Sequence, residues 1–260
     1  MNSINPIEVS FLVLDFRKEA ETRNCLESIR RSVKIPYKTV YLDNGAWDSE
    51  YPNQLYREEL CDVIIRKKNG MGGGYGQTDL IRFCDTPYFI FVQNDQELMC
   101  DITPHIFKYM KDALSMGFHC VDLNGDQSRR GVWTDRAHFM KTDVFNGLAP
   151  FPNGGPGLDN VKWNEQYLQE EFANRKYQIF HPGFGVFADC GKWSVREAGD
   201  GLYEHRCDTK ILNILKQPTY KTATYPPFTD AEWELVLAGK WENGTIPENW
   251  KKHSFKFWSN

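Results

Sequence analysis

The sequence has no long apolar run and no excess of basic charge. No apolar stretch approaches the roughly 20 residues that a membrane-spanning helix needs, and the N-terminus lacks the basic and apolar segments of a signal peptide. The 35 acidic and 31 basic residues give a net charge of −4, so no overall positive field attracts nucleic acid or anionic lipid. We therefore expect a cytoplasmic protein that spans no membrane and binds no nucleic acid.

The seven cysteines also lack any paired spacing. Their number is odd, no two form a CxxC motif, and several lie in apolar runs, where a thiol behaves as a small hydrophobic group. A disulfide framework is therefore not expected, and a reducing compartment is favoured. His205 and Cys207 have no matching second pair of ligands, so we expect no zinc site.

The first half of the 260 residues alternates strand and helix patterns. The expected strands cover residues 8–14, 38–43, 62–66, 88–93 and 118–123, and the expected helices cover residues 19–32, 76–84 and 104–116. Such alternation predicts an α/β domain with a mostly parallel sheet, in which ligands lie beyond the carboxyl ends of the strands. The second half contains a Gly/Pro-rich loop at 147–157, a helix at 161–174 and a strand at 177–181, followed by an irregular tail.

Two of the expected strand ends carry a carboxylate, Asp15 and Asp43. A carboxylate at that edge can accept hydrogen bonds from a nucleobase or a ribose. Asp43 also opens the turn dipeptide Asn44-Gly45, so its other interpretation is a turn residue that caps the next segment. The spacing leaves both interpretations open.

A glycine-rich segment, residues 69–76, follows the third expected strand. It contains Asn69 and the consecutive Gly72, Gly73 and Gly74, and it is preceded by Lys67, which could face a phosphate. Glycines let backbone N–H groups approach a ligand closely. The segment is neither a Walker loop nor a dinucleotide fingerprint. The alternative interpretation is a tight turn between strand and helix.

The polar run Gln93–Glu97 ends the fourth expected strand, where a divalent metal bridging two phosphates would be held. Asp95 is the best ligand in this run, and Gln93 offers only a neutral carbonyl oxygen. His181 ends a later strand-like run and could add an imidazole ligand. The alternatives are a surface turn for the polar run and a structural role for the histidine.

Acidic residues in the second half are candidates for a general base. Asp159 and Glu165 flank Trp163, and Glu170 and Glu171 follow. A hydroxyl that attacks a sugar needs a carboxylate within hydrogen-bond reach. The alternative is that these acids lie on a solvated helix face.

Taken in order, residues 8–181 resemble the family 2 glycosyltransferases, which have the GT-A fold, and within them the rhamnosyl- and galactofuranosyltransferase-like branch. The similar segments are the opening strand and helix at 8–29, YLDNGAWD at 41–48 against "VDNGSxD", 69–76 against "NxGxGGxxN", 88–95 against the strand before a DxD motif, and 157–177 against "GFDE…YEDxDLxxRxxxxGY". His181 falls where the family often has a late histidine.

The resemblance implies a Rossmann-like, mostly parallel nucleotide-binding sheet with helices on both faces, and an inverting transfer. It implies a nucleotide-sugar-binding half in residues 1–100, an acceptor and catalytic half of the same domain in 101–215, and a C-terminal extension in 216–260. The implied partners are a nucleoside-diphosphate-sugar and a glycan or lipid-linked sugar acceptor, as in polysaccharide biosynthesis, with peripheral membrane contact allowed.

The resemblance also implies a role for each candidate site residue. Asp15, Asp43, Lys67, Asn69, Gly72, Gly73 and Gly74 would bind the donor; Asp95, Gln93 and His181 would hold Mn²⁺ or Mg²⁺; Glu165, with Asp159 as second choice, would be the base.

The sequence departs from the family at two of these positions. Gln93 replaces the first acid of the DxD motif, which puts metal dependence in doubt, and Asn164 replaces the first acid of the ED pair. One alternative is therefore a catalytically inactive nucleotide-sugar-binding or scaffold protein. Another alternative is a sugar nucleotidyltransferase. It is disfavoured because residues 14–21 contain no glycine-rich loop.

Overall fold

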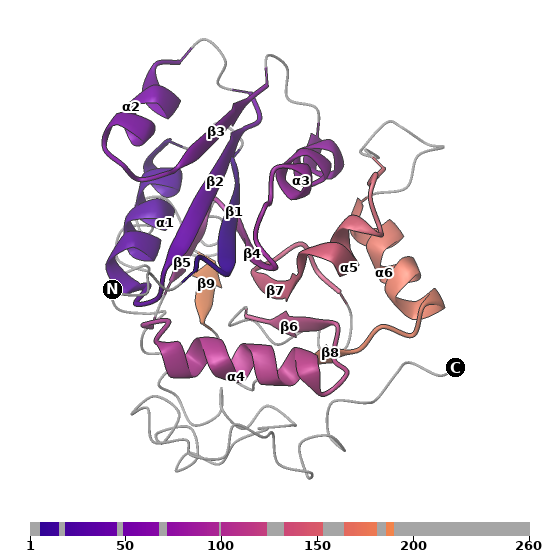
Figure 1. Cartoon of the computed structure of the whole chain (residues 1–260). Helices are drawn as coiled ribbons and strands as arrows, with labels where there is room; N and C mark the ends of the chain where they lie inside the picture. The colour runs from indigo at the N-terminus through magenta and orange to yellow at the C-terminus, as the bar shows by residue number, and fades with distance from the viewer. Residues whose placement is uncertain are drawn as a thin grey trace, which may run out of the picture.

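The computed structural model describes residues 6–15, 19–45, 49–67, 72–98, 100–123, 133–152, 164–180 and 186–189. Within these ranges seven strands form one sheet in the order β3-β2-β1-β4-β7-β6-β8 (Figure 1). They are β1 (Val9–Asp15), β2 (Tyr37–Asp43), β3 (Val63–Arg66), β4 (Tyr88–Gln93), β6 (Cys120–Asp122), β7 (His138–Lys141) and β8 (Ile179–Phe180). Only β7 is antiparallel to its neighbours in this sheet. The expected α/β fold with a mostly parallel sheet is confirmed.

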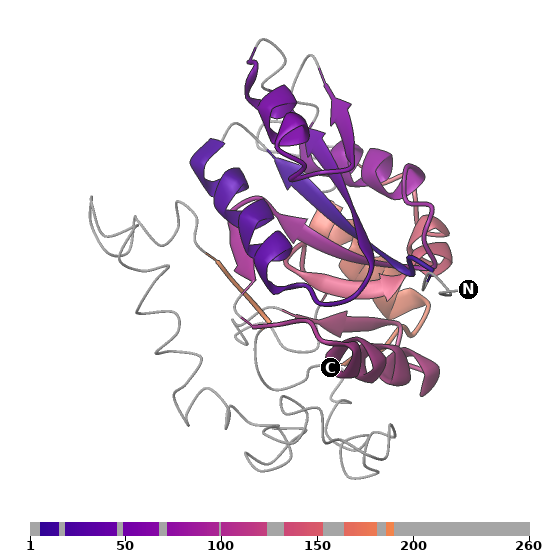
Figure 2. The same ribbon diagram turned by 60° about the vertical axis from the view of Figure 1, so that its left-hand side comes forward.

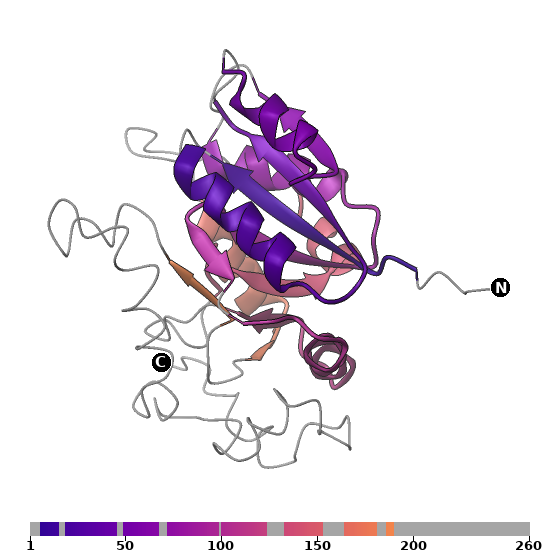
Figure 3. The same cartoon turned by 90° about the vertical axis from the view of Figure 1, so that its left-hand side faces the viewer.

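Helices cover both faces of the sheet. One face carries α1 (Glu19–Ser32), α2 (Tyr51–Arg57) and α4 (Pro104–Ser115), and the other carries α3 (Gly72–Arg82), α5 (Thr142–Asn146) and α6 (Asn164–Asn174). Figure 2 shows α1 on one side of the strands with α3 and α6 on the other, and Figure 3 shows α1 in front of the sheet.

Two apolar cores follow from the alternation of side chains along each strand. In β1, Phe11 and Val13 belong to the core under α1, whereas Leu12 belongs to the core under α3. In β4, Ile90 faces the first core and Phe91 the second. Because both faces are covered, the central strands are almost continuously apolar, which is the pattern that the sequence analysis used.

Capping residues explain the start of α4. Thr103 is extended and its hydroxyl accepts a hydrogen bond from the Ile106 N–H at 3.3 Å, while Pro104 occupies the first helical position. The helix ends at Ser115, one residue before the predicted end. None of the helices in the described ranges is long and apolar enough to cross a membrane.

Several short elements were not predicted. They are α2, α5 and β7, and a second sheet in which β5 (Gln96–Leu98) pairs with β9 (Phe187–Asp189) in antiparallel fashion. The predicted helix at 76–84 was placed too late, because α3 already begins at Gly72. The predicted tail beyond residue 216 lies outside the described residues.

Candidate functional site

The carboxyl ends of β1, β2, β3 and β4 meet at one edge of the sheet. The register places Asp15 beside Asp43, and Leu14 beside Gln93. Backbone hydrogen bonds continue past the strand ends, from Asn44 N to Asp15 O (3.1 Å), from Asn94 N to Leu14 O (3.0 Å) and from Lys67 N to Asp43 O (2.9 Å). The fold thus brings together the predicted residues of four separate sequence segments.

Asp15 is fully buried beneath this edge. Its two carboxylate oxygens accept hydrogen bonds from the Tyr41 hydroxyl at 2.6 Å and from the Asn94 side-chain amide at 2.7 Å. Burial, followed by the nearby Asp15 charge, raises the pKa of Tyr41, so its hydroxyl stays protonated as a donor. Asp15 therefore joins the ends of β1, β2 and β4 through these two hydrogen bonds.

Asp43 is also buried, and it joins a turn to an arginine. One carboxylate oxygen accepts from Gly45 N at 3.2 Å, the local turn contact that its alternative interpretation expected. The other accepts from Arg66 Nε at 3.3 Å, and Arg66 also donates to the Ser49 carbonyl at 2.7 Å. Arg66 was not predicted from the sequence, where its only signal is its place at the end of the third strand.

Within the glycine-rich segment, the consecutive Gly72, Gly73 and Gly74 form the first turn of α3. A Cβ on Gly74 would lie 1.9 Å from the Pro152 carbonyl oxygen, which explains why that position has no side chain. The first N–H groups of a helix are unpaired within the helix, and they favour an anion. Lys67, which was predicted to face phosphate, forms an ion pair with Asp79 of α3. Asn69 lies outside the described residues.

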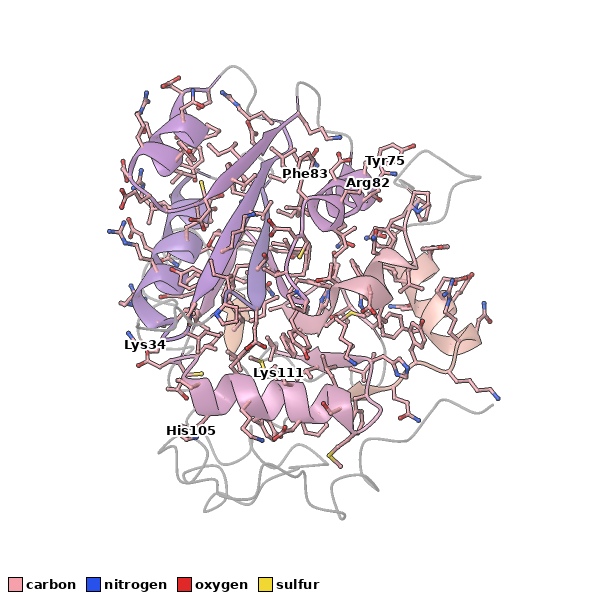
Figure 4. The ribbon with its side chains drawn as sticks, in the orientation of Figure 1. Lys34, Tyr75, Arg82, Phe83, His105 and Lys111 are labelled. Atoms are coloured by element: carbon pink, nitrogen blue, oxygen red, sulfur yellow. The ribbon has the colours of Figure 1, made fainter. Side chains whose placement is uncertain are left out.

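The outer side of α3 is exposed. Tyr75 and Phe83, both labelled with Arg82 in Figure 4, are 43% and 55% exposed. Gln77 and Thr78 are buried on the inner side, and the Thr78 hydroxyl accepts a hydrogen bond from Phe151 N at 2.9 Å. The first turn of α3 is therefore fixed by the segment at 151–152.

The side chain at the end of β4 contacts a carboxylate, Asp135, that was not predicted from the sequence. The Gln93 side-chain nitrogen donates to Asp135 Oδ2 at 2.9 Å. Burial, and then the neighbouring charge of Glu165, raise the pKa of Asp135 to about 6. No motif marked Asp135, because its proximity to Gln93 arises from the pairing of β7 with β4, two strands far apart in the sequence.

Glu165 lies in the first turn of α6, beside the first turn of α3. The Asn164 side-chain nitrogen donates to Gln77 Oε1 at 2.7 Å, and a Cβ on Gly74 would lie 3.4 Å from Asn164 Cβ. The candidate base is thus beside the candidate phosphate-binding turn and beside Asp135. Asp159 and His181 lie outside the described residues.

Gln93 and Asp95, near the end of β4, carry side-chain oxygen atoms of the kind that divalent cations bind. Within the described ranges no group of three or more His, Cys, Asp or Glu side chains could hold a metal ion. Asp95 lies two residues beyond the end of β4, after Asn94, and no described residue donates to Gln93 Oε1. Mg²⁺-type sites use one or two carboxylates together with substrate phosphates, so Asp95 with the Gln93 side-chain oxygen would be a set of that size.

No family model matches the chain, and no curated protein matches its sequence. Among solved structures, residues 1–349 of TarS from S. aureus match at a TM-score of 0.51 and 14% identity, covering 70% of this chain and 60% of that one. A mannosyltransferase from Pyrobaculum calidifontis, PcManGT, in complex with GDP-Man and Mn²⁺, matches at a TM-score of 0.56 and 13% identity, covering 91% and 74%. The chain has a GT-A-like glycosyltransferase fold.

A longer TarS structure from S. aureus agrees, with a TM-score of 0.52 and 12% identity over 90% of this chain and 43% of that one. The chain therefore spans about 60% of the shorter TarS structure and less than half of the longer one. At such low identity the likeness establishes the fold alone.

Proposed function

We propose that this chain is a glycosyltransferase that moves a sugar from a nucleoside-diphosphate-sugar to a hydroxyl acceptor. The observation that carries the proposal is the convergence of two helix N-termini at the carboxyl edge of the sheet. The first turn of α3 offers N–H groups to a diphosphate, and the first turn of α6 places Glu165 beside it. The glycosyltransferase fold supports the same reaction class.

In this proposal the donor lies across the strand ends. Asp43 binds the base or the ribose. Arg66 donates to its carboxylate, and the buried Asp15 fixes the neighbouring strand end. Gly72, Gly73 and Gly74 face the diphosphate, together with Asn69 and with Lys67 after exchange of its Asp79 partner. Residues 1–100 then form the donor half and residues 101–215 the acceptor half of one domain. Pairing of β4 with β7 supports a single sheet across that boundary.

The transfer is an inverting single displacement. The acceptor hydroxyl gives its proton to the Glu165 carboxylate, or to Asp159 as second choice, while its oxygen forms a bond to the anomeric carbon. The bond from that carbon to the diphosphate oxygen breaks, and the nucleoside diphosphate leaves with the electron pair. The α3 N-terminus stabilises the charge that develops on the leaving group.

We propose that Mn²⁺ or Mg²⁺ arrives with the donor. Asp95, Gln93 and His181 would hold it, and it would supply positive charge to the diphosphate. The Mn²⁺ and GDP-Man bound by PcManGT support this assignment. For the acceptor we propose a glycan or lipid-linked sugar in polysaccharide biosynthesis, as the family 2 resemblance implies.

A second candidate is a protein that binds the donor without transferring it. Gln93 and Asn164, which replace family acids, favour this alternative. Turnover distinguishes the two candidates, because the binding protein retains donor affinity and releases no nucleoside diphosphate.

The test compares two glutamates of α6. Wild-type protein is incubated with UDP-, GDP- and dTDP-sugars, with Mn²⁺, and released nucleoside diphosphate is measured. Glu165→Gln removes the base, so we expect turnover to fall by about 100-fold or more while donor binding is retained. The control is Glu170→Gln, on the exposed side of the same helix. Equal turnover in both variants would refute Glu165 as the base.

A further inference from the structure

Gln93 is the last residue of β4, and its side chain contacts Asp135, which lies in the segment just before β7. β7 runs antiparallel to β4 with His138 opposite Phe91, so the residues just before His138 extend past the end of β4. From there Asp135 accepts the hydrogen bond of the Gln93 side-chain nitrogen at 2.9 Å. The contact joins segments that lie 42 positions apart in the sequence.

This contact decides which end of the Gln93 amide is available. A carboxylate can only accept a hydrogen bond, so it takes the NH₂ end of the amide. The remaining hydrogen bonds of Gln93 use its backbone, from its N–H to Gln96 Oε1 and from Cys25 Sγ to its carbonyl. Within the described ranges no donor reaches Gln93 Oε1. The side chain therefore keeps an oxygen free at the strand end.

We propose that Asp135 is a positioning residue that fixes Gln93 with its side-chain oxygen available as a ligand for the donor's divalent cation, next to Asp95. The inference rests on the proposed function and adds a residue to it. Gln93 has no charge of its own, and its amide could equally present N–H donors, which repel a cation. Asp135 removes that second orientation. Residues that orient a metal ligand contribute strongly to metal affinity.

Two variants change the hydrogen bond between positions 93 and 135, and the second of them keeps the total charge of the pair. Asp135→Asn has nearly the same shape but can donate as well as accept, so it no longer selects one orientation of Gln93. In the double variant Gln93→Glu/Asp135→Asn, the Asn donates to the Glu, so the hydrogen bond is kept with its direction reversed. That double variant always presents an oxygen at position 93. Asp101→Asn, at an exposed position away from the site, is the control.

The experiment measures thermal shifts with UDP and with GDP, over a titration of Mn²⁺. We expect Asp135→Asn to bind nucleotide without metal as the wild type does, but to need about tenfold more Mn²⁺ for the same shift. The double variant should recover most of that loss, and Asp101→Asn should match the wild type. If the single variant does not fold, the double variant carries the test.

Three results would overturn the inference. The first is that Asp135→Asn needs no more Mn²⁺ than the wild type. The second is that the double variant folds but its thermal shift depends less on Mn²⁺ than that of the wild type. The third is that the thermal shift of the wild type with nucleotide does not change with Mn²⁺. The last of these would leave the proposed function standing, because the nucleotide still binds. A wild-type protein that binds neither nucleotide, with or without Mn²⁺, would overturn the proposed function as well.

Discussion

His138 lies on β7 with its ring stacked on Phe91, at 5.3 Å between centroids, and with Trp133 and Phe145 around it. It is 2% exposed, and its Nδ1 lies 2.7 Å from the Arg136 carbonyl oxygen, to which it donates. Within the described ranges its Nε2 has no hydrogen-bond partner. A second proton on this ring would place a charge in an apolar core.

This environment makes stability depend on pH. Burial lowers the pKa of His138 from 6.5 to about 4, against weaker opposing effects of the Arg136 carbonyl and Asp122. Because the folded pKa is depressed, the neutral ring's contribution is complete above pH 6.5 and is lost as the pH falls toward 4. We expect a loss of about 3 kcal/mol in the free energy of unfolding over this range.

Urea denaturation at several pH values between 7.5 and 4.5 measures this loss. His138→Phe keeps the aromatic packing and removes the titration, so its stability should fall less steeply with acid than that of the wild type. His105, exposed on α4 and labelled in Figure 4, supplies the control His105→Gln, which should keep the wild-type slope. Parallel curves for wild type and His138→Phe would contradict this explanation.

The sequence alone predicted the positions of those candidate site residues that end a strand or start a helix. Asp43 and Gln93 were predicted at the strand ends where the structure places them, and Glu165 lies in a helical first turn. Asp135 and Arg66 were missed for a physical reason. Their roles depend on side-chain contacts between segments distant in sequence, and no local periodicity records such contacts.

The start of α3 shows how an element is shaped by the segment packed against it. A Cβ on Gly74 would lie 1.9 Å from the Pro152 carbonyl oxygen, which is backbone and cannot rotate away. A Cβ on Gly76 would lie 2.6 Å from Leu14 Cδ1, the end of a side chain that can change rotamer. The two glycines occupy the same helix but differ in what an added methyl group would meet.

This contrast predicts different costs for the same substitution. Gly74→Ala should lower the free energy of unfolding by about 2–3 kcal/mol, because the 151–152 segment must move. Gly76→Ala should cost less than about 1 kcal/mol, since the higher helix propensity of alanine offsets part of the contact. Urea denaturation of both variants measures the difference. Equal costs would mean that the 151–152 segment does not pack on α3 in solution.

The long elements were predictable, whereas several of the short ones were not. β1 and β4 have a continuous apolar run, and α1 and α4 have a helical period, with a capping residue at the start of α4. The structure places each within a residue or two of the predicted bounds. β5 and β7 are too short to show a period. Both owe their conformation to pairing with a partner strand, which the sequence does not reveal.

Across the whole molecule, the candidate site lies at one edge of the sheet because most of the strands run the same way. Two apolar cores fix the strands from both faces, and the polar residues gather where the strands end. The order of motifs in the sequence predicted this arrangement, because parallel strands separated by helices must bring their carboxyl ends together. The sequence did not predict that β7 would add Asp135 to that edge.

The most direct test of the account is a calorimetric titration of the wild-type chain with UDP, GDP and dTDP and their sugar conjugates, with and without Mn²⁺. We expect one nucleoside diphosphate to bind clearly more tightly than the others. Asp43→Asn should weaken its binding by at least about tenfold, the effect of losing one charged hydrogen bond in a buried site. Absence of binding by every nucleotide and conjugate would contradict the assignment of the strand ends as a donor site.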